Sequence, residues 1–197
     1  EENNRNRRME EHKINILQVQ NGAERVTQVP LPNFLTVSAG CAYDNVNKQL
    51  VVAGLYSEKS KDRANGAFYI RMTSGATIPQ VVHNEPFDDK FISILRQKEV
   101  GDDTKGIDES EVKQLVLRQD GGAVMVVERN HQLQRGASAG RGFWRDGMRL
   151  VIDYYYDDLF VLGFQPDGKP QWKTVLHKKQ YSQDDEGTFS SFFLFLN

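Results

Sequence analysis

The residues best suited to binding a ligand lie between Arg129 and Tyr156. Arginine supplies N–H donors in a rigid plane and aromatic rings supply flat stacking area, so clusters of the two are typical of binding surfaces. We therefore predict a site for a protein or glycan ligand here, formed by Arg141, Trp144, Arg145 and Tyr155. If Tyr154 and Tyr156 instead face a sheet interface while Trp144 covers a loop, the same cluster has a structural role.

Acidic residues are concentrated at Asp157-Asp158 and again in Gln183–Gly187. Paired carboxylates can bind Ca²⁺ or act as an acid–base couple. Neighbouring residues of a strand point to opposite faces, however, so we favour an Asp that accepts backbone N–H groups beside a solvated one. The second group lacks the alternation of an EF-hand loop, which favours a solvated loop. The alternative function is a hydrolase or lyase that uses strand-end acids with calcium assistance.

The histidines and the single cysteine suggest no further chemistry. His12, His83, His131, His177 and Cys41 share no metal-ligand spacing, so we predict no catalytic residue, metal or cofactor. One cysteine excludes an internal disulfide, and its apolar alternating surroundings predict a buried thiol. The glycine-rich stretch 136–142 lacks the lysine of a phosphate-binding loop.

Composition limits the class of protein. The chain has 197 residues, a formal net charge of −2 and 39% hydrophobic residues, which is typical of a globular protein and gives no general attraction to nucleic acid. No apolar run approaches the ~20 residues of a membrane-spanning helix. We expect a polar N-terminal tail over residues 1–12 and a single domain over 13–197; the oligomeric state is left open.

Turn residues divide the chain into β-hairpins. Residues 157–177 contain an apolar run, a Pro-Asp-Gly turn and a second run that includes Trp172, and residues 66–82 are a weaker copy in which Phe68 matches Phe160. Asn21-Gly22 predicts an earlier hairpin of the same kind. Residues 87–95 fit either a short helix after Asp88-Asp89 or a buried strand.

Strands therefore recur in antiparallel sets of four, at about 34–87 and 111–182. Leu50–Gly54 aligns with Val124–Glu128, and the second unit carries an extra loop over 129–153. A half unit precedes the two, and residues 190–196 open another. This pattern predicts a partial β-propeller, with a two-sheet β-sandwich as the alternative. A closed propeller needs roughly four or more blades, so we expect the chain to be a piece of a longer protein.

Three segments carry a resemblance to a known kind of protein: residues 118–128, 154–168 and 172–182. They resemble uncharacterised bacterial secreted β-propeller-like repeat proteins. The resemblance implies a propeller fold and a periplasmic or cell-surface location, but no reaction, since propellers host many functions.

We accordingly expect a non-catalytic binding or scaffolding module of an exported bacterial protein. In such a fold Trp172 would be interblade core, and its replacement by Ala would cost about 3–5 kcal/mol. The Trp144→Ala change would cost little stability.

Overall fold

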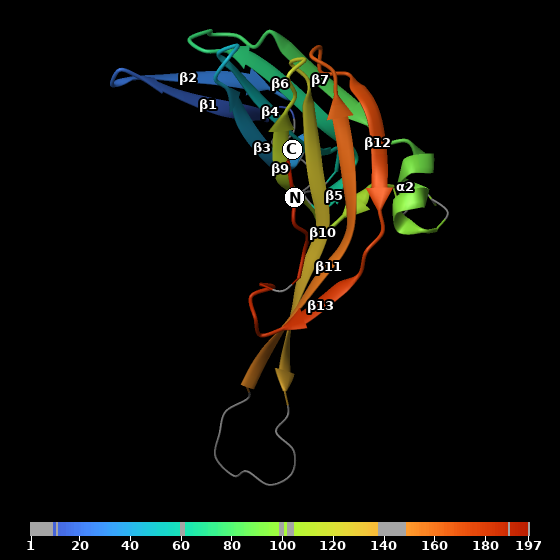
Figure 1. The fold of residues 1–197 in the computed structure, drawn as a ribbon. Coiled ribbons are helices and arrows are strands. Elements are labelled where there is room, and N and C mark those ends of the chain that lie inside the picture. The colour runs from blue at the N-terminus through green and yellow to red at the C-terminus, as the bar shows by residue number, and fades with distance from the viewer. Residues whose placement is uncertain are drawn as a thin grey trace.

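A computed structural model describes residues 10, 12–59, 62–98, 101, 105–137, 149–188 and 190–196. These residues form antiparallel β-sheets with the short helix α2 (Figure 1), and none of the described sheets closes into a barrel. The prediction of an all-β, antiparallel fold is confirmed.

The first large sheet is a four-stranded meander in chain order. Its strands are β3 (Leu35–Asp44), β4 (Gln49–Ser57), β6 (Gly66–Thr73) and β7 (Val81–Pro86). These bounds match the predicted unit at 34–87.

The second large sheet repeats the same order. Its strands are β9 (Ser110–Leu117), β10 (Ala123–Ala137), β11 (Arg149–Phe164) and β12 (Pro170–Leu176), while β13 (Gln180–Gln183) pairs with the N-terminal half of β11. Residues 111–182, predicted as a set of four strands, therefore belong to a five-stranded sheet, because β13 joins the four strands of the meander.

Short elements complete the fold. The hairpin of β1 (Lys13–Gln20) and β2 (Ala23–Pro30) turns at Asn21-Gly22, whose φ values of 51° and 78° fit the tight turn expected there. Strands β5 (Arg63–Ala64) and β8 (Ile107–Asp108) form a small ribbon. Helix α2 (Asp89–Arg96) begins after Asp88, whose carboxylate accepts the N–H of Phe91 at 2.7 Å; of the two alternatives for 87–95, the helix is the correct one.

Three layers enclose two cores. The main core lies between the two large sheets and includes Tyr69, Phe160, Phe164 and Phe91 of α2. The second core lies on the opposite face of the first sheet, where the β1–β2 hairpin contributes Ile16 and Val29. Burial of both faces explains the nearly continuous apolar run of β4.

Phe68 and Phe160, which are aligned in the sequence, occupy comparable positions in their two sheets. Phe68 belongs to the core beneath the β1–β2 hairpin, whereas Phe160 belongs to the core between the sheets, so each faces the unit that precedes its own. Phe68 pairs with Gly54, and Phe160 pairs with Val127. If these phenylalanines are equivalent, Gly54 matches Val127, and its predicted alignment with Glu128 is one residue out of register.

Two side chains are more exposed than predicted. Trp172 is 42% exposed, because it lies on the outer face of the second sheet and covers Gly163 of β11, where an added Cβ would overlap the indole. The prediction of an interblade core tryptophan is therefore wrong within this chain. Cys41 is exposed rather than buried, since the hairpin does not cover that part of β3.

Two segments differ from their predicted conformations. Residues 129–137 and 149–153, expected within an extra loop, continue β10 and β11 as paired strands. Residues 190–196, expected to open a new unit as a strand, have no regular secondary structure among those described. The reason is that no described strand forms backbone hydrogen bonds with these residues, as a β-strand requires.

Candidate binding site on the β10–β11 arm

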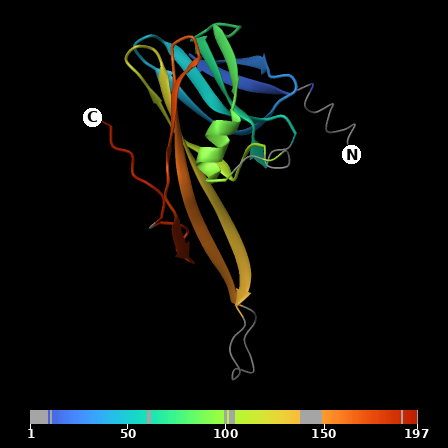
Figure 2. The same cartoon turned by 90° about the vertical axis from the view of Figure 1, so that its right-hand side faces the viewer.

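Strands β10 and β11 extend beyond the body of the two sheets as a narrow arm (Figures 1 and 2). The arm begins after a bulge, where Asp157 and Asp158 of β11 lie opposite Arg129 of β10, and its pairing continues as far as Ala137 and Arg149. A two-stranded ribbon alone is only marginally stable. Here β13 adds a third strand at the base of the arm, and this explains why the segment is ordered as a sheet.

One face of the arm carries a row of aromatic rings across three strands. His131 of β10 stacks on Tyr155 of β11 with ring centroids 4.5 Å apart and an interplanar angle of 11°. Tyr155 in turn contacts Tyr181 of β13 at 5.2 Å. Direct cross-strand pairing places these three residues side by side. Tyr181 is 53% exposed, so the row presents an aromatic surface to solvent.

Asp153 joins the three strands next to the aromatic row. Its carboxylate accepts hydrogen bonds from Arg135 Nε at 2.5 Å, from the Tyr181 hydroxyl at 2.7 Å and from Gln183 Nε2 at 3.0 Å. The Arg135 bond is the largest of the effects that lower the pKa of Asp153 to about 2. The same carboxylate raises the pKa of Tyr181. These hydrogen bonds hold Tyr181 of the aromatic row in place beside β11.

The opposite face of the arm is covered around Tyr154 and Tyr156, but not farther along, where Leu150 is 58% exposed. Tyr154 is 6% exposed, and Gly187 lies directly against the Tyr156 ring. Asp184 accepts the backbone N–H of Ile152 at 2.9 Å, which anchors this turn to β11. The alternative in which Tyr154 and Tyr156 are structural is supported for these two residues, while Tyr155 lies on the other face. The acids of 183–187 help to hold the turn and do not form a purely solvated loop.

Of the paired acids at the bulge, Asp158 has structural partners, whereas Oδ1 of Asp157 is buried with no hydrogen-bond partner among the described residues, so Asp157 is not the solvated carboxylate expected. Asp158 Oδ1 accepts the backbone N–H of Lys178 at 3.2 Å and lies 3.1 Å from Nδ1 of His177. Arg129 lies 3.7 Å from Asp158 and 3.2 Å from Asp108. The interpretation that one Asp accepts a backbone N–H is confirmed. Among the described residues, no group of three or more His, Cys, Asp or Glu side chains is placed to hold a metal ion.

The predicted site is described in part. Tyr155 lies in the aromatic row, whereas Arg141, Trp144 and Arg145 lie outside the described residues, in the segment that joins β10 to β11. Sequence reasoning missed His131 and Tyr181. His131 could have been found from the sequence if β10 and β11 had been extended as a hairpin centred on residues 138–148, because that register places His131 opposite Tyr155. Tyr181 could not, because its place in the row depends on the pairing of β13 with β11.

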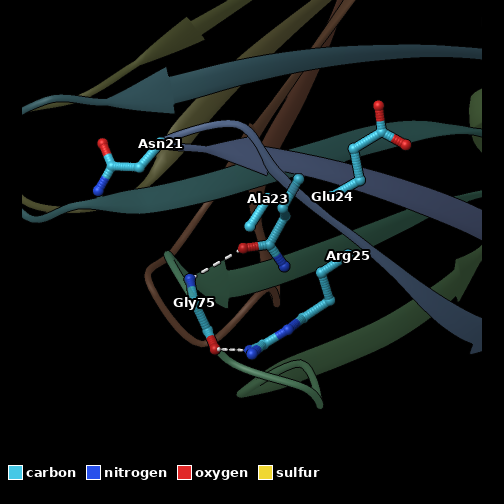
Figure 3. Close-up of a pocket in the computed structure, with 6 residues that line it drawn as sticks. Asn21, Ala23, Glu24, Arg25 and Gly75 are labelled. Carbon is cyan, nitrogen blue, oxygen red and sulfur yellow. Dashed lines mark hydrogen bonds between the residues drawn. The ribbon is translucent and has the colours of Figure 1, made fainter.

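A cavity of about 570 Å³ lies elsewhere, at the tip of the β1–β2 hairpin (Figure 3). Arg25 Nη1 donates to the carbonyl of Gly75 at 2.5 Å, and the N–H of Gly75 donates to Gln18 Oε1 at 2.8 Å. Through these two hydrogen bonds, Gln18 and Arg25 attach the hairpin to the β6–β7 turn (Figure 3). We assign this cavity a structural role.

Comparison with protein-family models, with curated proteins and with solved structures finds no match to this chain. Within the described part of the chain, no helix has the length and apolar character needed to cross a membrane.

Proposed function

We propose that this chain is a non-catalytic binding or scaffolding module of an exported bacterial protein, located in the periplasm or at the cell surface. The carrying observation is the arm, which projects beyond the sheets and holds His131, Tyr155 and Tyr181 as an aromatic row. A rigid aromatic surface gains contact area at low entropic cost, which suits a protein or glycan ligand. Arg141, Trp144 and Arg145, which follow along the chain, would complete the site.

A propeller-like arrangement is the finer description of the fold that we propose. In two sheets related by a two-fold axis, equivalent residues would face each other across the core. Phe68 and Phe160 instead both face the preceding unit, as expected when successive blades stack in one direction around an axis. A β-sandwich accommodates the same two sheets but does not require this repetition.

The alternative of a hydrolase or lyase draws little support from the described residues. The buried carboxylates in and beside the arm, Asp153, Asp158 and Glu128, each have two or more hydrogen-bond or ion-pair partners, and the one carboxylate oxygen there without a partner among the described residues, Oδ1 of Asp157, is buried away from solvent. A general acid or base must reach a substrate proton, and these side chains are already engaged.

A glycan array tests the proposal with a defined probe. The labelled chain is applied to an array of bacterial surface oligosaccharides, and each hit is measured in solution by calorimetry. Tyr155→Ala and Trp144→Ala should each weaken binding by about tenfold, the loss expected for one stacked aromatic ring. Ile78→Ala is the matched control, because Ile78 is 74% exposed and distant from the arm in the chain.

Absence of any hit would direct the search to a protein ligand. Equal affinity of the wild-type chain and both arm variants for a confirmed ligand would contradict the proposed site.

A further inference from the structure

Part of the outer face of the first sheet is uncovered beside the β1–β2 hairpin. A groove of about 380 Å³ lies there, lined by Leu17, Val19, Tyr43, Leu50, Met72 and their polar neighbours. Leu17 and Val19 belong to β1, which among the described strands pairs with β2 alone, so the other edge of β1 has no strand partner in that part of the chain and faces the groove.

The groove is apolar and open to solvent. Leu17 is 59% exposed, Val19 64% and Tyr43 43%, although all three lie in strands. An exposed strand edge with apolar side chains on both sides is the kind of surface that accepts an additional strand from another chain.

The C-terminal segment Ser190–Leu196 has complementary chemistry. Phe193 is 89% and Phe195 77% exposed, whereas the alternate residues Phe192 and Leu194 are half-buried, so the side chains alternate as in a strand. The segment has no strand partner among the described residues. It starts on the outer face of the second sheet, where the Ser191 hydroxyl donates to the buried Glu128 carboxylate at 2.8 Å.

We propose that the segment 190–196 of one copy adds as a strand to the free edge of β1 in a second copy, with Phe193 and Phe195 entering the groove. The segment and the hairpin lie on opposite outer faces of the two-sheet stack (Figure 2), which favours a second copy over the same chain. The result is head-to-tail association.

Sedimentation velocity over a concentration series tests this association. The wild-type chain should shift from monomer to larger species as concentration rises. The double change Phe193→Asp with Phe195→Asp should abolish the shift, since both side chains are exposed and a charge would enter an apolar groove. Ile78→Asp, at an equally exposed site outside both surfaces, should leave it unchanged. A wild-type chain that is monomeric at all concentrations would overturn the proposal.

Mixing two defective variants separates head-to-tail pairing from other contacts. The Leu17→Lys and Val19→Lys double variant lacks the groove but keeps the segment, and the Phe193/Phe195 variant lacks the segment but keeps the groove. Each alone should be monomeric, and the mixture should give a one-to-one dimer that grows no further. A mixture that stays monomeric, or a groove variant that still associates, would contradict the assignment.

The single cysteine reports which chain supplies the strand. Cys41 is exposed on β3, two residues from Tyr43 of the groove. With Phe195→Cys added, mild oxidation should give disulfide-linked dimers and higher species on a non-reducing gel. A disulfide formed within one chain would instead show that the segment fills its own groove, and would overturn the second-copy assignment.

Discussion

At the scale of single residues, Asp153 of β11 is the side chain that joins the three strands of the arm. It is 2% exposed and receives hydrogen bonds from β10 through Arg135 and from β13 through Tyr181 and Gln183. Hydrogen bonds from these three partners favour the ionised form of the carboxylate over its protonated form.

This gives the Asp153→Asn change a defined pH dependence. The pKa of Asp153 is about 2 in the folded chain and about 4 in an unfolded chain, so the stabilising effect is complete above pH ~4 and lost as the pH falls toward 2. The difference in melting temperature between wild type and Asp153→Asn should therefore shrink over this interval in calorimetric scans. A difference that is independent of pH would mean that the ion pair does not stabilise the folded chain.

The two large aromatic residues Trp172 and Phe160 should differ in their effect on stability. Phe160 is fully buried in the main core, and Phe160→Ala should cost about 3–5 kcal/mol by denaturant unfolding. Trp172 is partly exposed over Gly163, and Trp172→Ala should cost about 1–2 kcal/mol. Equal losses would show that the outer face of the second sheet is covered in solution.

At the scale of elements, the arm is ordered as far as β13 supports it. Tyr181 contributes both a ring to the aromatic row and a hydrogen bond to Asp153. Tyr181→Ala should therefore accelerate hydrogen exchange of backbone amides in 130–135 and 151–156, with little change in the first sheet. Lys179→Ala, at an exposed neighbouring position, is the control. Uniform acceleration in both sheets would contradict a local role.

The sequence was informative where local chemistry determines the structure. Asn21-Gly22 and the Pro-Asp-Gly turn each fix a backbone geometry within a few residues, and so the hairpins could be predicted, while the Asp88 cap made a helix one of the two alternatives for 87–95. The arm could not, because the strand that supports it comes from later in the chain. Alternation predicts which face of a strand a side chain occupies but not what covers that face, as Trp172 and Cys41 illustrate.

At the scale of the whole molecule, the two sheets share one core and should unfold together. Phe160 and Phe164 of the second sheet pack with Tyr69 of the first, so neither sheet retains a complete core alone. In a Trp144→Phe variant, the fluorescence of Trp172 reports on the second sheet while far-UV circular dichroism reports on both. The two denaturation curves should coincide. Separate midpoints would indicate sheets that fold independently.

The binding account is tested most directly by photo-crosslinking from the arm. A benzophenone amino acid placed at position 144 is exposed to a bacterial envelope fraction, and the adducts are identified by mass spectrometry. The account predicts a discrete protein or glycan adduct that Tyr155→Ala diminishes and that is missing when the probe replaces Val46, which is 87% exposed in the β3–β4 turn. Identical adducts from positions 144 and 46, or no adduct from position 144, would contradict a binding role for the arm.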